Sequence, residues 1–197
     1  MTPSPPIHDS VALLRQALVQ MDTLVQAISP ESLHAPTPCP DFDVTALLDH
    51  LGMIADRVTA AAGGDTAKEF TRGAKSATPS QVAQWQARLV RVTAAMDGCD
   101  LTAIVELPFG TMPLSAAFGV FVGEFTTHAW DLAAAIGRQD LLDDDLGAAA
   151  LAMVTVRVPA SPREDTPFAD VVAVPDSASV HDQLAGWMGR DPVAWVQ

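Results

Sequence analysis

The stretch PLSAAFGVFVGEFTTHAWDLAAAIG, residues 113–137, decides the fold, because it predicts the longest helix of the chain. Only Glu124 and Asp131 carry a formal charge in it, and apolar side chains fill most of the other positions. Proline suits the first turn of a helix, and glycine suits the residue after its end, where left-handed backbone angles are common. We therefore predict a helix from Pro113 to Ile136 that Gly137 closes.

Apolar residues recur at helical spacing in three further long segments. The expected helices run from Asp9 to Ile28, from Asp43 to Ala62 and from Pro79 to Met96, the last of them after a capping-box pattern at residues 78–81. Two shorter helices are expected at residues 144–156 and 181–188, and residues 102–107 could form a short strand before a turn at 108–113. Four long helices with short connections predict an all-α four-helix bundle with a small irregular C-terminal tail.

The length of 197 residues favours one domain. Prolines at positions 3, 5 and 6 predict a disordered lead-in over residues 1–8. Residues 9–141 are expected to form the helical bundle, and residues 142–197 a helix and a tail that pack on it. The longest uncharged stretch, residues 107–123, is short and broken by prolines and glycines, which argues against a membrane span.

The composition is strongly acidic, with 11 Lys and Arg against 24 Asp and Glu and a formal net charge of −13. Such a surface repels phosphate groups, so nucleic acids and anionic membranes are poor partners. Two cysteines, Cys39 and Cys99, fit a reducing cytosol better than a disulfide scaffold, and the N-terminus lacks the pattern of a signal peptide. We expect a cytoplasmic protein. A homodimer is left open, since helical bundles can dimerise and no patch in the sequence decides it.

Glu124 and His128 lie four residues apart, which places them one turn apart on one face of the long helix. An unpaired carboxylate beside the apolar stripe of that helix is costly, and a metal ion would neutralise it. His50, at the edge of the apolar arc of the helix at residues 43–62, is the best candidate for a third ligand. Two histidines and one carboxylate would leave a coordination position open, as in catalytic sites. The alternative is a chance surface pair and a boundary histidine.

Three stretches resemble one known family. TPCPDFDVTALLDHLG, residues 37–52, resembles its TPCPDW signature and the histidine-leucine pair that follows, with Phe42 in place of the tryptophan. LPFGTMPLSAAFGVFVGEFTTHAWDLAAAIGR, residues 107–138, resembles its segment with an acid and a histidine before WDLA. LAGWMGRDPVAW, residues 184–195, resembles the tail of a small actinobacterial branch of uncharacterised metal-binding proteins. On these residues the chain resembles the mycothiol-dependent maleylpyruvate isomerase N-terminal domain family.

The resemblance implies a DinB-like four-helix bundle with a metal site at His50, Glu124 and His128, the same three residues that the spacing selects. Zn or Ni is the expected divalent metal. Asp131 matches the acid of the WDLA motif. The resemblance implies that Asp131 either contacts the His128 ring on the side away from the metal and so orients it, or orients a substrate. The alternative for Asp131 is a solvated residue or a polar residue with an intrahelical role.

The resemblance also implies a thiol cofactor, mycothiol, and hence a transferase or isomerase that brings a small-molecule thiol to an electrophile. The alternatives are a metal-dependent hydrolase with Asp131 as its base, and a non-catalytic bundle that binds a metal or a small molecule. Arg57 and Arg190 could reach the site, but both are interpreted as surface residues, and Cys39 as a small packed residue. The full isomerase has a substantial C-terminal domain that supplies part of its active site, and in this sequence only the residues after Leu142 correspond to it. The reaction and its substrate are therefore not predicted.

Overall fold

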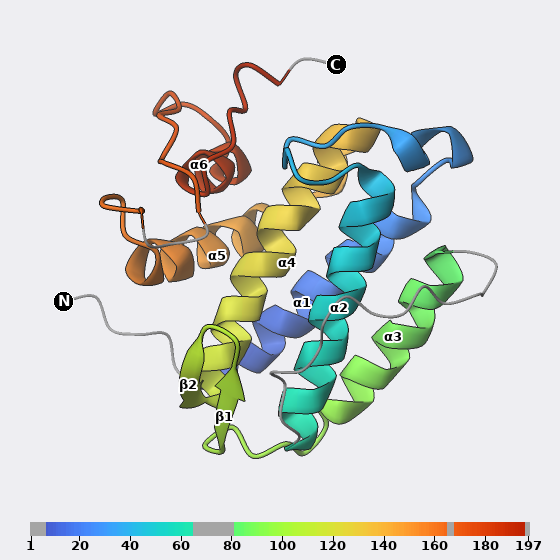
Figure 1. The fold of residues 1–197 in the computed structure, drawn as a ribbon, viewed down its shortest axis with the longest axis vertical. Helices are drawn as coiled ribbons and strands as arrows, with labels where there is room; N and C mark the ends of the chain where they lie inside the picture. The colour runs from blue at the N-terminus through green and yellow to red at the C-terminus, as the bar shows by residue number, and fades with distance from the viewer. Residues whose placement is uncertain (1–6, 65–80, 165–167, 196–197) are drawn as a thin grey trace.

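The computed structural model of the chain describes residues 7–64, 81–164 and 168–195. Four helices form a bundle (Figure 1): α1 (Ile7–Gln26), α2 (Val44–Gly63), α3 (Gln81–Ala95) and α4 (Leu114–Ile136). Helix α1 packs against α3 and α4, and α2 packs against the same two helices. The prediction of an all-α protein built on a DinB-like four-helix bundle with an irregular C-terminal tail is confirmed.

Helix α4 forms the centre of the core. Most of its residues are buried, and the rings of Phe118, Phe121 and Phe125 have almost no exposed surface. It contacts α1 and α2 of the bundle, and also α5 (Asp144–Arg157) and α6 (Val180–Trp187) of the C-terminal part. Because α4 is covered along most of its length, its polar side chains must find partners inside the protein. Among the described residues, neither α4 nor any other helix has the combined length and apolarity that a membrane crossing requires.

Helix α2 is anchored at its first turn. The side chain of Asp43 caps the helix, as expected, by accepting a hydrogen bond from the Ala46 amide at 2.7 Å. Thr45 Oγ1 donates to the Leu33 carbonyl at 2.8 Å, which ties the start of α2 to the short 3-10 helix η1 (Pro30–His34). These contacts fix where α2 begins, and so they fix the height of its residues along the bundle.

The C-terminal part packs on the long helix. Asp143 caps α5 by accepting hydrogen bonds from two amides of its first turn, at 3.0 and 3.2 Å, and α5 begins at residue 144 as expected. A short 3-10 helix, η3 (Gln139–Leu141), connects α4 to α5. Helix α6 contacts both α5 and α4, and Trp130 Nε1 of α4 donates to Asp182 Oδ1 of α6 at 2.9 Å. The tail is therefore joined to the bundle by a polar contact as well as by apolar packing.

Several helix boundaries differ from the expectations by one or two residues, and one element differs as well. Helix α1 begins at Ile7 rather than at Asp9, so residues 7 and 8 belong to the helix and not to a lead-in. Residues 108–113 form more than a turn, because Gly110–Pro113 is a strand, β2, that pairs antiparallel with β1 (Ile104–Leu107). Gly110 has a φ of 143°, which glycine adopts without strain. The expected disorder over residues 1–6 and most of the capping box, residues 78–80, lie outside the described residues.

Two glycines of α4 offer a matched test of how closely α5 packs on it. A Cβ at Gly123 would lie 2.7 Å from Cγ1 of Val154, whereas a Cβ at Gly119 would lie 2.8 Å from Nη2 at the flexible end of Arg157. We expect Gly123→Ala to lower the free energy of unfolding by about 1–3 kcal/mol, because the branched valine cannot move aside. Gly119→Ala is expected to leave it unchanged or to raise it by up to about 1 kcal/mol, the gain in helix propensity. Urea unfolding followed by circular dichroism measures both, and equal effects would contradict this packing.

Candidate metal centre

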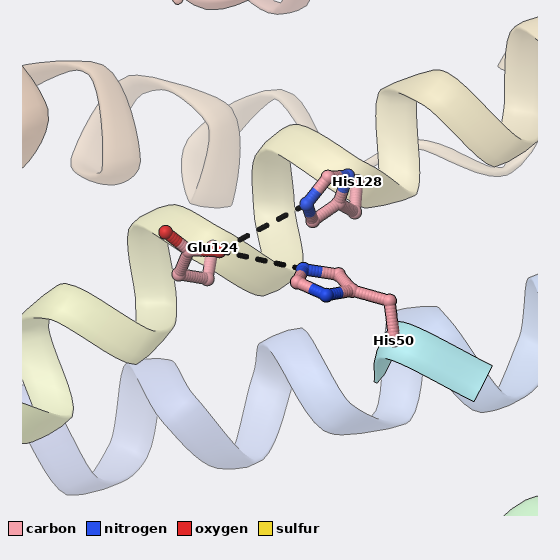
Figure 2. Close-up of side chains that lie close together, drawn as sticks. All are labelled: His50, Glu124 and His128. Carbon is pink, nitrogen blue, oxygen red and sulfur yellow. Dashed lines mark ion pairs between the residues drawn. The ribbon is translucent and has the colours of Figure 1, made fainter. Parts of the chain in front are cut away.

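The side chains of His50, Glu124 and His128 converge between α2 and α4 (Figure 2). Nε2 of His50 lies 4.0 Å, and Nε2 of His128 lies 3.8 Å, from the same carboxylate oxygen, Oε2 of Glu124. One ligand-type atom from each residue lies within 4.8 Å of the other two. Helix α4 supplies Glu124 and His128 from successive turns, and α2 supplies His50. The structure thus brings together the three residues that the sequence analysis selected.

The spacing of these atoms suits a shared ion better than direct hydrogen bonds. The two N···O distances, 3.8 and 4.0 Å, are longer than an N–H···O hydrogen bond. Bonds from a metal to an imidazole nitrogen or a carboxylate oxygen are about 2.0–2.2 Å long, so two such bonds span a gap of about 4 Å. These three side chains could therefore hold a metal ion. Within residues 7–64, 81–164 and 168–195, they are the one group of His, Cys, Asp and Glu side chains with ligand atoms this close together.

His50 presents a neutral ring to the cluster. Burial, with a further contribution from the positive charges of Arg57 and Arg190, lowers the pKa of His50 from its ordinary 6.5 to about 3. Its ring stacks on Phe42 with the ring centroids 4.9 Å apart, and it meets the ring of His128 edge-on at the same centroid distance. The imidazole is unprotonated at neutral pH, as a metal ligand has to be.

Asp131 fixes the opposite edge of the His128 ring. Nδ1 of His128 lies 2.8 Å from Oδ2 of Asp131, almost one turn further along α4. An ionised carboxylate only accepts hydrogen bonds, so Nδ1 carries a proton and Nε2, which faces Glu124, is the nitrogen that is left to bind a metal. Asp131 therefore orients this ring and sets its tautomer. Asp131 is not solvated, because its side chain has no exposed surface, whereas its contact with His128 does lie within one helix.

Arg190 of the C-terminal tail pairs with the same carboxylate. Its Nε and Nη2 donate to the two oxygens of Asp131 at 3.1 and 2.8 Å, which is a bidentate geometry. Burial alone would raise the pKa of Asp131, but the hydrogen bond from His128 and the charge of Arg190 outweigh it and hold the pKa below its ordinary value. Burial in turn disfavours the charged guanidinium, yet the charge of Asp131 prevails and raises the pKa of Arg190. A chain of contacts thus runs from the tail, through Asp131, to His128.

The sequence analysis expects Arg190 at the surface, and this expectation is wrong. The side chain is only 12% exposed and forms a buried ion pair. Helical periodicity says nothing about where a tail docks, so the spacing of residues could not place it. A usable signal was Asp131 itself, because an acid on an otherwise apolar helix needs a cation from elsewhere in the chain.

Three other residues surround the cluster. Phe42, at the position where the resembled family has tryptophan, supplies the ring that stacks on His50. Arg57 is partly buried, and its charge reaches His50. Cys39 is buried, as expected for a small packed residue, and burial raises the pKa of its thiol although Arg190 opposes this. A protonated, buried thiol is a poor nucleophile and a poor ligand.

Comparison with known proteins links this geometry to a family. Residues 14–133, more than half of the chain, match the model of the mycothiol maleylpyruvate isomerase N-terminal domain. Two relatives, both named as uncharacterised proteins, come from two strains of Mycobacterium tuberculosis. Each is 27% identical over 187 residues, a match that covers 85% of this chain and 90% of the relative. No solved structure matches the chain significantly. The matched residues include the cluster and Asp131 but not Arg190, which the tail supplies.

The buried pair of Asp131 and Arg190 can be tested by a double-mutant comparison. Arg190→Met leaves a buried carboxylate without its cation, and we expect it to lower the free energy of unfolding by about 3–5 kcal/mol. Asp131→Asn added to Arg190→Met removes that charge, so the double variant should be more stable than Arg190→Met alone. Urea unfolding of the wild type, of Arg190→Met and of the double variant measures these differences in the free energy of unfolding.

The control for this comparison is Arg138→Met. Arg138 also forms a bidentate pair, with Asp140 at 2.8 and 2.9 Å, but both partners are exposed. Exposed ion pairs contribute little to stability, so this variant should unfold like the wild type. If Arg138→Met and Arg190→Met lowered the free energy of unfolding equally, the buried carboxylate of Asp131 would not be the cause of the loss in Arg190→Met.

Proposed function

Since the chain belongs to the mycothiol maleylpyruvate isomerase N-terminal domain family, we propose that it is a metal- and thiol-dependent transferase or isomerase. The proposed ligands are His50, Glu124 and His128, and the proposed metal is Zn or Ni. Mycothiol is the proposed thiol, and an electrophilic small molecule is the second substrate. A cytoplasmic location, in which low-molecular-weight thiols are kept reduced, is part of the proposal.

The observation that supports a metal most directly is the convergence of a nitrogen of each histidine on one carboxylate oxygen of Glu124. Asp131 holds the proton of His128 on Nδ1, and burial keeps His50 neutral, so both rings can offer a lone pair. Glu124 adds one negative charge between them. Two neutral nitrogens and one carboxylate form a donor set that divalent metals accept, and three protein ligands leave room for a further one. The residues present therefore fit the proposed group.

The chemistry that such an ion would supply is ionisation of a thiol near neutral pH. The protein's own residues prepare the place for it. Phe42 covers one face of His50 and limits its movement, and Asp131 fixes the ring of His128. Arg190 keeps Asp131 ionised, so Asp131 remains a hydrogen-bond acceptor for His128. In this proposal the thiol and the electrophile meet at the open side of the cluster, next to Glu124, whose side chain is 29% exposed.

The contacts and burial of Asp131 argue against the hydrolase alternative. A hydrolase needs a general base beside the attacking water, and Asp131 was the candidate from the sequence. Both oxygens of Asp131 already accept hydrogen bonds from His128 and Arg190. Its pKa lies below the ordinary value, and its side chain has no exposed surface. Asp131 is therefore suited to position His128 and not to take a proton from water.

Metal content tests the proposed ligands. We expect about one divalent metal ion per wild-type chain and its loss in His50→Ala and His128→Ala, since each removes one of three protein ligands. Asp131→Asn keeps all three ligands but weakens the hold on His128, so metal affinity should fall about 10–100-fold. Elemental analysis of untagged protein and competition with a chromophoric chelator provide the measurements.

His34→Ala serves as the matched control for the ligand variants. Its ring is exposed and lies outside the cluster, so this variant should keep the wild-type metal content. A wild-type protein that binds no zinc or nickel after incubation with either ion would rule out the metalloenzyme proposal. A tightly bound ion that survives His128→Ala would show that the site lies elsewhere.

Thiol binding is tested separately on cobalt(II)-loaded protein. We expect N-acetylcysteine to produce a sulfur-to-cobalt charge-transfer band in the near ultraviolet, because the three protein ligands leave a coordination position open. N-acetylserine, which has oxygen in place of sulfur, should produce none. If neither N-acetylcysteine nor mycothiol produces the band in protein that holds cobalt, the thiol part of the proposal is wrong and the metal site remains.

A further inference from the structure

A cavity of about 460 Å³ lies beside the C-terminal half of α4. Its other walls come from η3, from the first turn of α5, from α6 and from the tail. Its wall consists of apolar, uncharged polar and acidic side chains and one histidine: Trp130, Ala134, Gln139, Leu142, Asp144, Ser179, His181, Asp182, Pro192 and Trp195. None of His50, Glu124 and His128 belongs to this wall. The volume falls within the range typical of small-molecule sites. The cavity is therefore a separate feature from the metal cluster.

Two residues of the wall carry buried polar atoms without a hydrogen-bond partner among the described residues. His181 is 3% exposed, and its Nε2 lies 2.9 Å from the carbonyl oxygen of Asp143. A carbonyl only accepts, so Nε2 carries the proton and Nδ1 is left as an acceptor with no partner. Nε1 of Trp195, a donor, is likewise buried and unpaired. Buried polar groups are nearly always hydrogen-bonded, so an acceptor and a donor left unpaired at one cavity indicate a missing partner.

The charge of the wall selects the kind of partner. Asp144 and Asp182 contribute carboxylates, and among the described residues no Lys or Arg lines the cavity. Burial lowers the pKa of His181 and keeps its ring neutral at pH 7, although the neighbouring acids oppose this shift. Nε1 of Trp130 donates a hydrogen bond to Asp182, so this indole ring lies beside a carboxylate. Carboxylates beside indole rings attract cations and repel anions.

We propose that this cavity binds a small organic ammonium ion that also carries a hydroxyl or similar acceptor group. The ammonium group donates to the unpaired acceptor of His181 and to the carboxylate of Asp182. The acceptor group of the ligand pairs with Nε1 of Trp195. The apolar body of the ligand lies against the indole rings of Trp130 and Trp195, where cation–π attraction adds to apolar contact.

Nuclear magnetic resonance of nitrogen-15-labelled protein tests this site directly. The chain has four tryptophans, and their indole N–H signals can be assigned from single Trp→Phe variants. The probe is 2-amino-1-phenylethanol, which carries an ammonium and a hydroxyl group. We expect it to shift the signals of Trp130 and Trp195 in a saturable manner. The signals of Trp85 and Trp187, which donate to Asp22 and to the Val158 carbonyl, should not move.

Two analogues and two variants make the test specific. 1-Phenyl-1,2-ethanediol replaces the ammonium with a hydroxyl and should bind at least tenfold more weakly, and mandelate, an anion, should not bind. Asp182→Asn keeps an oxygen for Trp130 but removes the charge, and should weaken binding of the amine about tenfold. Asp176→Asn removes an exposed carboxylate that is not part of the wall, and this variant should bind the amine like the wild type.

Several outcomes would overturn the proposal. A cavity that holds only water gives no shift with any probe. Equal binding of the amine, the diol and mandelate shows an apolar site without charge selection, and shifts of all four indole signals show unspecific contact. The titrations use metal-free wild-type protein and His50→Ala, in which we expect the same affinity. Failure of the metal and thiol proposal would therefore leave this result unaffected.

Discussion

The carboxylate of Asp131 lies without solvent contact in the C-terminal half of α4, a helix that is buried along most of its length, and the arrangement around this carboxylate follows from that constraint. A buried charge is tolerated only if it is paired and hydrogen-bonded. Arg190 brings the pairing charge from the C-terminal tail, and His128 brings a further hydrogen bond from α4. Such pairs need not add stability, but they specify an arrangement. One buried acid thus relates the docking of the tail to the orientation of a proposed metal ligand.

Most of the fold could be predicted from the sequence, because its helices end at strong local signals. Helix α2 lies between the Asp43 cap and Gly64 as expected, and α4 ends before Gly137. The hairpin was missed in part, since Gly110 and Pro113 are turn formers and give a strand of four residues no recognisable alternation. Its pairing with β1 depends on backbone hydrogen bonds across a tight turn, which side-chain patterns do not reveal.

The candidate site shows a similar division between local and distant information. Glu124 and His128 follow from helical spacing, which holds for any regular helix. Placing His50 beside them required either the packing of α2 on α4 or a resemblance to a family. Arg190 could not be placed by spacing, because it lies beyond α6 and reaches α4 only through the tertiary fold. The general lesson is that an unexplained charge on an apolar helix calls for a search for its partner.

The site also has a consequence for the order of folding. Its parts come from the second helix, the longest helix and the tail, so completing it means closing some of the longest loops in the chain. Contacts between distant segments form more slowly than local ones, whereas helices form early. We expect the bundle to bring His50 and His128 together before Arg190 docks on Asp131. If the proposed metal ion binds in that interval, it meets a His128 ring that is not yet fixed, so the full affinity of the proposed site would depend on the docking of the tail.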